Sequence, residues 1–309
     1  MDIILYTVAP LIGKIAIMVA IGFACKRMRL VTDTFQKQLN DFAMQVILPF
    51  NILASCGNEF SQELSKGLAI TAVISGCYYV AMLALASVTS KVMPLKPDER
   101  TIFITMATFA NVGFLGFPVA QELCGTEGTL YTVIHNVMYQ LVMFSYGISL
   151  LNGTGKIDLV GMLKKPLMII SLCSVAIFLS PFRFPAFVQG SITMVGDTIV
   201  PLSLILIGMS LADIPVMELL RDKYSYLVSL FRLVISPLMV YAGLRIFHVT
   251  GTVAVLAVVI ASMPVGSLNV MFAQQYHKAP EFATRSLVHT MLFMFITLPV
   301  MIVLAMTLQ

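Results

Sequence analysis

Charged residues are scarce in this chain. Asp, Glu, Lys and Arg together make up 11% of the 309 residues, whereas a typical soluble domain has about 25%. Residues of the hydrophobic set reach 59%. A chain this apolar throughout leaves no segment suited to form a soluble domain. The sequence therefore predicts an integral membrane protein.

Motifs for catalysis and metal binding are also lacking. There is no H-E-x-x-H sequence and no serine in a G-x-S-x-G elbow, so the common zinc and serine hydrolases are excluded. The five cysteines are scattered without a C-x-x-C pair, which argues against a metal or disulfide framework. They are Cys25, Cys56, Cys77, Cys124 and Cys173. We expect no enzyme activity, no metal, no cofactor and no nucleic-acid partner. The first apolar stretch has no basic segment before it, so we expect no cleaved signal peptide.

Long apolar stretches follow one another along the chain. A membrane-spanning helix needs roughly 20 apolar residues, and by this measure the sequence predicts ten spans. They cover residues 5–25, 39–57, 67–91, 101–123, 129–151, 166–181, 191–212, 224–247, 252–276 and 283–307. The fold class is therefore expected to be an all-α, multi-pass membrane protein.

Positive charges are distributed unequally between the loops. The connections after the odd-numbered spans hold 14 Lys and Arg residues, whereas the other side holds Lys66, Arg183 and Arg245. Cytoplasmic loops are enriched in Lys and Arg. We therefore expect both termini to face away from the cytoplasm, in a plasma membrane or bacterial inner membrane.

The two halves of the chain show weak internal similarity. A shift of 153 residues places Asn111-Val-Gly113 on Pro264-Val-Gly266 and Ala120-Gln121 on Ala273-Gln274, and a shift of 152 places Pro49 on Pro201. Because the shift carries five spans, an odd number, the halves are expected to have opposite orientations. This predicts inverted repeats at residues 1–151 and 166–309, joined by a short linker at 152–165.

Helix-breaking and polar residues interrupt the fourth and ninth expected spans. They are Asn111, Gly113, Gly116 and Pro118 in the fourth span, and Pro264, Gly266, Ser267 and Asn269 in the ninth. Proline removes an amide donor and glycine leaves helical geometry at little cost. In a bilayer such a break is tolerated only where it is buried in protein or lines a cavity. Two breaks in corresponding positions therefore predict a substrate-binding site.

Several motifs resemble those of one transporter family. They are N-x-G-F-L-G-F-P from Asn111 to Pro118, P-x-G at Pro264 followed by V-M-F-A-Q-Q-Y ending at Tyr276, and L-N-D-F-A from Leu39 with Leu48-Pro49. Over nearly the whole chain the sequence resembles the auxin efflux carrier family, whose bacterial members are linked to malate and other organic acids. Where plant members typically have prolines, this chain has Ala110 and Asn269, and the long cytoplasmic loop of many plant members is missing.

The resemblance implies a two-part architecture like that of bile-acid and sodium/proton transporters. Spans one, two, six and seven would form a scaffold that dimerises, and spans three to five and eight to ten a transport domain in which helices four and nine cross. Two half-helix N-termini, each with about half a positive charge, would then point at one place. A small organic anion suits that place as the substrate.

A few polar side chains lie inside the expected spans. Asn136 and Gln140 share one helix face, and they either line the cavity or bond neighbouring helices. Asp197 is either a proton or cation site or a solvated residue near the interface. Lys14 and Arg232 are expected to attract the anion, to extend to the interface, or to neutralise Asp197.

Two functions stay open on this fold. A cation/proton antiporter or sodium-coupled symporter usually needs acidic residues at the crossing, and neither Asn111–Pro118 nor Pro264–Asn269 contains one. A channel would typically need a repeated filter or a charged ring. We therefore favour a secondary active or potential-driven transporter of small organic anions such as malate or auxin-like acids. Protons, sodium or the membrane potential alone remain alternative driving forces.

Overall fold

A computed structural model describes residues 9–55, 61–153, 166–212 and 222–309. Regular structure in these ranges is helical, apart from one isolated bridge between Ala110 and Val265. The prediction of an all-helical protein is confirmed. The linker predicted at residues 152–165 lies almost entirely outside the described residues.

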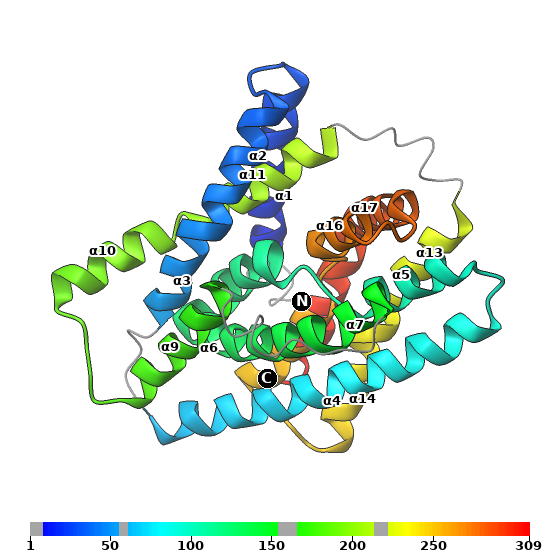
Figure 1. The fold of residues 1–309 in the computed structure, drawn as a ribbon. Helices are drawn as coiled ribbons and strands as arrows, with labels where there is room; N and C mark the ends of the chain where they lie inside the picture. The colour runs from blue at the N-terminus through cyan, green and yellow to red at the C-terminus, as the bar shows by residue number, and fades with distance from the viewer. Residues whose placement is uncertain (1–8, 56–60, 154–165, 213–221) are drawn as a thin grey trace. The chain divides into compact units, whose positions relative to one another are not determined.

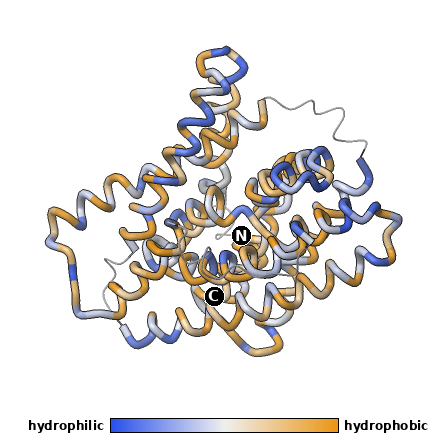
Figure 2. Tube along the Cα trace, viewed as in Figure 1, coloured by the Kyte–Doolittle hydropathy of each residue, from blue (hydrophilic) through white to orange (hydrophobic). Residues whose placement is uncertain are grey.

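Long apolar helices are present in the part of the chain that the structure describes. Four candidate membrane spans cover Gln62–Val92, Ala186–Ala212, Lys223–Ile246 and Pro280–Met306, and Pro166–Leu179 and Thr252–Ala261 are shorter apolar helices. Figure 2 shows hydrophobic residues along most of the helical segments. Large side chains such as Phe187 and Met194 are exposed, as expected for a surface that faces lipid. The number of ten spans stays a prediction, since several expected spans are divided into shorter helical pieces.

The chain divides into two compact units. Unit 1 comprises residues within Met1–Ala69, Gly113–Ile134 and Lys165–Ile214, and unit 2 residues within Ile70–Val112, His135–Lys164 and Pro215–Gln309. Two helices pass from one unit into the other along the chain: α4 (Gln62–Val92) and α6 (Phe117–Val142). Each unit is described below by itself.

Unit 1 is built around α1 (Ala9–Arg27) and α11 (Ile199–Ala212), which lie side by side with α2 (Asp33–Phe42) (Figure 1). Glycines bring the first two helices close together. A Cβ added to Gly22 would lie 1.9 Å from the Ile205 carbonyl oxygen, and one added to Gly208 would lie 2.0 Å from that of Val19. Small residues at helix contacts are typical of membrane proteins, because they let backbones approach closely.

The remaining helices of unit 1 surround the second expected span. The π-helical segment η2 (Ala43–Ile47) follows α2 and leads into α3 (Leu48–Ala54), which packs against α9 (Pro166–Leu179) and α10 (Ala186–Gly196). Gly196 lies directly against the backbone of Asn51. This contact places the end of α10 beside the middle of α3.

Unit 2 contains most of α4 and the second part of α6. Its other elements are α5 (Pro97–Thr108), η5 (Met143–Gly147), α7 (Ile148–Asn152), α13 (Lys223–Leu230), η6 (Phe231–Ile235), α14 (Ser236–Ile246), α15 (Thr252–Ala261), α16 (Ser267–Gln275) and α17 (Pro280–Met306). Helix α17 packs against α13, α15, α16 and α5. Fully buried side chains such as Phe103, Met106 and Phe109 form the core. This packing brings the ends of α5 and α15 together.

Candidate functional site

Two helices of unit 2 end at the same place. Helix α5 ends at Thr108 and α15 at Ala261, and short extended segments follow both. The amide of Asn111 donates to the Pro264 carbonyl at 2.8 Å, and the amide of Gly266 donates to the Phe109 carbonyl at 3.2 Å. We call this antiparallel pairing, Phe109–Asn111 with Pro264–Gly266, the crossing. It satisfies backbone groups that the helix breaks set free, as a bilayer interior requires.

The break in the fourth span includes Asn111, as expected, but lies upstream of the other three residues that we expected to cause it. Gly113 and Gly116 belong to a π-helical segment, η4 (Val112–Gly116), and Pro118 is the second residue of α6. The prediction that Pro118 ends a helix is therefore wrong. A π turn is wider than an α turn, and this accommodates the missing amide and the ring of Pro118 without ending the helix. These three residues belong to unit 1.

Asn269 ties the start of α16 to the crossing. Its side chain is fully buried, and Nδ2 donates to the carbonyls of Phe109 and Gly266, at 3.0 Å each. Its Oδ1 is buried and has no hydrogen-bond partner within the described structure. Asn111 is buried as well, whereas Ser267, the first residue of α16, is exposed. Of the two polar residues predicted in the ninth span, Ser267 is therefore accessible, whereas Asn269 uses its amide nitrogen within the crossing.

Arg232 lies inside unit 2 and is 0% exposed. Its guanidinium donates to the carbonyls of Thr108 and Met263, at 2.9 Å each, and to that of Ala261 at 2.6 Å. The guanidinium also donates to the Ala107 carbonyl at the longer distance of 3.3 Å, and to the hydroxyl oxygen of Tyr78. Of the three roles expected for Arg232, extension to the interface is wrong, because the side chain points inward to the crossing.

Tyr78 is a member of this site that sequence reasoning missed. Its hydroxyl donates to the Thr108 carbonyl at 3.2 Å and lies 3.1 Å from the Ser236 hydroxyl. The Ser236 hydroxyl in turn donates to the Ala261 carbonyl at 2.9 Å. Nothing in the sequence distinguishes Tyr78 from an ordinary packing residue, since aromatic side chains are common in apolar helices.

Two buried amides lie on the face of α6 that adjoins the crossing. Asn136 and Gln140 are both buried, and Asn136 Nδ2 and Gln140 Nε2 have no hydrogen-bond partner in the described residues. On the same face, the ring of Tyr139 packs edge-on against that of Phe109, with centroids 5.6 Å apart. Two buried donors without acceptors can bind a carboxylate oxygen.

A chain of polar side chains runs through unit 1. Asn51 Nδ2 donates to Gln121 Oε1 at 2.7 Å, and Gln121 Nε2 donates to Asp197 Oδ1 at 2.6 Å. Asp197 follows the last residue of α10 and lies in the middle of the candidate span Ala186–Ala212. The expected span of residues 191–212 would put Asp197 near its start. That boundary is wrong, because the helix begins at Ala186, and regular helix is interrupted at residues 197–198. The side chain of Asp197 is exposed within the chain itself.

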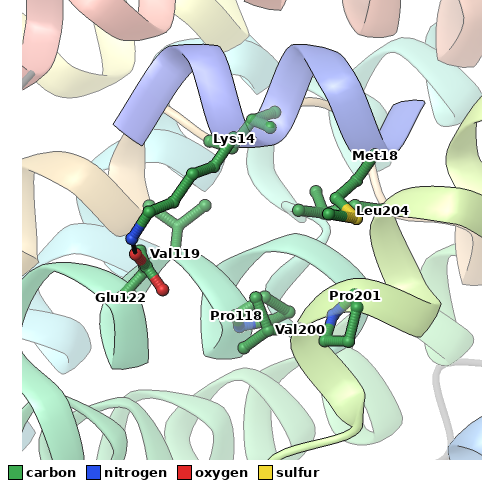
Figure 3. Close-up of a pocket in the computed structure, with 9 residues that line it drawn as sticks. Lys14, Met18, Pro118, Val119, Glu122, Val200, Pro201 and Leu204 are labelled. Atoms are coloured by element: carbon green, nitrogen blue, oxygen red, sulfur yellow. Dashed lines mark hydrogen bonds and ion pairs between the residues drawn. The ribbon is translucent and has the colours of Figure 1, made fainter. Parts of the chain in front are cut away.

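Lys14 pairs with Glu122 at the rim of a pocket in unit 1 (Figure 3). The pocket has a volume of about 210 Å³ and is otherwise lined by apolar residues, among them Pro118, Val200 and Pro201. Figure 3 shows the Lys14 side chain reaching toward Glu122. Of the roles expected for Lys14, neutralising Asp197 is wrong, because its ammonium is paired with Glu122 and Asp197 bonds to Gln121.

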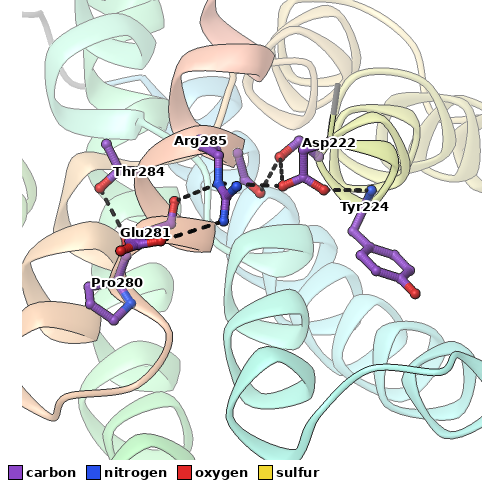
Figure 4. A network of polar contacts seen from close by, with 8 residues as sticks. Asp222, Tyr224, Pro280, Glu281, Thr284 and Arg285 are labelled. Atoms are coloured by element: carbon purple, nitrogen blue, oxygen red, sulfur yellow. Dashed lines mark hydrogen bonds and ion pairs between the residues drawn. The ribbon is translucent and has the colours of Figure 1, made fainter. Parts of the chain in front are cut away.

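A further polar network of unit 2 joins α13 to α17 (Figure 4). Asp222 begins α13 by accepting from the Tyr224 amide at 3.0 Å, and Arg285 Nε lies 3.7 Å from its carboxylate. Arg285 also lies 3.9 Å from the Glu281 carboxylate, one turn away on α17. All four groups are near helix ends, so the network is explained by helix capping and by an exposed ion pair.

Comparisons with known proteins indicate a membrane transporter. The family model described as "Membrane transport protein" matches residues 6–162 and 154–302. An uncharacterized transporter of Methanocaldococcus jannaschii is 24% identical over 271 residues, which are 85% of this chain and 87% of that protein. The protein is a multi-pass membrane transporter and not an enzyme, and the resemblance to auxin efflux carriers is confirmed at the level of the family. Since the match covers nearly the whole chain, the protein belongs to the membrane transport protein family.

Proposed function

We propose that the protein carries small organic anions, such as malate or auxin-like carboxylates, across the membrane by alternating access. The observation that carries the proposal is the chemistry of the crossing. A buried guanidinium and the start of α16 lie at one place, and no Asp or Glu occurs in residues 107–118 or 261–269. The guanidinium offsets the negative charge of the helix ends that it contacts, and the helix N-terminus beside them favours an anion.

The substrate carboxylate is proposed to accept hydrogen bonds from Asn136 Nδ2 and Gln140 Nε2. These two donors are buried and lack an acceptor within the described structure, and leaving such groups unpaired is costly. A bound carboxylate would satisfy both. Asn111 is proposed to contribute its side-chain amide, and Ser267 its hydroxyl. We also predict that Gly113, Gly116 and Pro118, which follow the crossing along the chain, contact the substrate.

Many transporters that work by alternating access are built from two related halves, and two corresponding contacts support this arrangement here. The Ser75 hydroxyl bonds His135 Nδ1 at 2.9 Å, and the Ser229 hydroxyl bonds His289 Nδ1 at 2.7 Å. Each member of the second pair lies 154 positions after its counterpart in the first. Because this shift carries an odd number of expected spans, the halves would be inverted, as in many secondary transporters.

The same shift of 154 aligns the elements around the crossing. It places α5 over α15, which end at Thr108 and Ala261, and it places Tyr78 on Arg232. We propose that unit 2 contains the transport domain and unit 1 the scaffold, through which two copies dimerise. Residues 113–134 group with unit 1, although the resemblance to auxin efflux carriers implied a place for them in the transport domain.

Transport by purified protein in liposomes tests the proposal. Uptake of radiolabelled malate and indole-3-acetate is measured with proton and sodium gradients imposed separately, and with protein-free liposomes as the control. We expect saturable uptake of at least one acid, with competition among small carboxylates. Protein that carries no carboxylate under any gradient, while remaining monodisperse and helical, would contradict the proposed function.

A cation-coupled mode is the second candidate, and Asp197 is the observation in its favour. The residue lies in the middle of a candidate span and bonds to Gln121, and because a charge inside a membrane is costly, an ionisable residue there is a candidate for a functional role. If protons drive transport, Asp197→Asn should flatten the pH dependence of uptake, because it removes one titrating group and preserves shape. Glu122→Gln, one position after Gln121, is the control. An unaltered pH profile in Asp197→Asn would exclude this residue as the coupling site.

A further inference from the structure

The guanidinium of Arg232 binds the ends of both interrupted helices. Two of its main-chain acceptors, Ala107 and Thr108, form the last turn of α5, and Ala261 is the last residue of α15. Met263, two residues further, accepts from Nε at 2.9 Å. One side chain therefore bridges two helix C-termini that come from opposite halves of the sequence.

The charge of Arg232 matters as much as its geometry. Each helix C-terminus carries about half a negative charge, so two of them at one point would repel each other and any anion. The contacts of Arg232 in the described structure go to carbonyl oxygens and to the Tyr78 hydroxyl, and none goes to a carboxylate. Its full positive charge is thus available to offset both helix ends.

We propose that Arg232 is a positioning residue that makes the crossing selective for anions. It holds the ends of α5 and α15 together and cancels their negative charge, so that the start of α16 and the buried amide donors determine which ligand binds. This inference rests on the proposed function, in which the crossing binds an organic anion. Without Arg232 the crossing would present negative helix ends to the substrate.

Three variants separate the effect of the positive charge of Arg232 from the effect of its hydrogen bonds. Arg232→Met removes the charge and the hydrogen bonds but keeps an unbranched side chain. Arg232→Lys keeps the charge, but an ammonium cannot reproduce the planar fork that spans two helices. Arg245→Met removes the same type of charge from the exposed end of the same candidate span, and it serves as the matched control.

The first experiment measures the preference for an acid over its neutral amide. Binding to the full-length protein in detergent is compared for malate and malamide, and for indole-3-acetate and indole-3-acetamide. In Arg232→Met we expect the preference for the acid to fall by about tenfold, equivalent to about 1.4 kcal/mol. Arg232→Lys should keep more of it, and Arg245→Met all of it. A folded Arg232→Met with an unchanged preference would overturn the assigned role in anion selection.

The second experiment needs no ligand. Hydrogen exchange is followed by mass spectrometry in peptides covering residues 109–116 and 263–269, which contain the amides of Asn111 and Gly266 that bond across the crossing. We expect faster exchange there in both Arg232 variants and wild-type exchange in Arg245→Met. Wild-type exchange in Arg232→Lys would overturn the positioning role, and this variant serves the test if Arg232→Met does not fold.

The results of the two experiments distinguish a failure of the proposed function from a failure of the inference about Arg232. If the wild-type protein binds neither acid, the proposed function fails, and hydrogen exchange alone decides whether Arg232 positions the crossing. If the wild type prefers the acids and Arg232→Met does so equally, the proposed function stands and the inference about Arg232 is wrong.

Discussion

At the scale of single residues, Gln140 offers a test with opposite effects on stability and binding. Its buried Nε2 has no acceptor in the described residues, which costs the empty protein about 1–3 kcal/mol. Gln140→Leu should therefore raise the unfolding temperature without substrate and weaken binding of the transported acid by about tenfold. Circular dichroism and a binding assay measure the two effects, with exposed Gln275→Leu as the control. Lower stability with unchanged affinity would mean that Gln140 only joins helices.

Asn111 is the residue of the fourth span that we expect to matter most for affinity. Its backbone amide bonds to Pro264, and this bond survives replacement of the side chain. Asn111→Ala removes hydrogen bonds to a charged ligand, each worth roughly 1.5–3 kcal/mol, so affinity should fall about ten- to a hundredfold. Binding to the purified variant is the measurement, and Asn40→Ala in α2 is the control. A folded variant with wild-type affinity would leave Asn111 only a structural role.

At the scale of elements, the contact between α1 and α11 depends on glycine. A Cβ at Gly208 would lie 2.0 Å from a backbone oxygen, which cannot move aside as a flexible side chain can. Gly208→Ala should lower the free energy of unfolding by about 1–3 kcal/mol, the usual cost of overpacking. Thermal unfolding in detergent measures this. Gly190→Ala in α10, where nothing lies within 4 Å of the added Cβ, should be neutral or slightly stabilising.

The two helix breaks were predictable to different degrees. Pro264 lies in the break between α15 and α16 because proline acts locally, by removing a donor and restricting the residue before it. The break after α5 occurs at Phe109–Asn111, where no proline or glycine is present. There the extended backbone is stabilised by pairing with Pro264–Gly266 and by Asn269. A partner 160 positions away along the chain leaves no local signal in the sequence.

At the scale of the whole molecule, orientation follows from loop charge. The bias of 14 Lys and Arg residues against three predicts that both termini face away from the cytoplasm. A reporter active only in the cytoplasm, fused after Gln309, should be silent, and one fused after Lys96 should be active. If both fusions were active, the two sites could not be separated by seven spans, and the proposed inverted repeat would have to be abandoned. An active fusion after Gln309 with a silent one after Lys96 would reverse the predicted orientation.

The sequence alone determined that this protein is a helical membrane transporter with a break in its ninth span, because hydropathy, proline and family motifs are properties of short segments. Only the tertiary structure decided the partners of Arg232, the membership of Tyr78 in the site and the unpaired donors of Asn136 and Gln140. Those properties depend on contacts between segments far apart in the chain. A buried arginine has the same sequence signature whether it meets a carboxylate, a ligand or two helix ends, and packing alone distinguishes these cases.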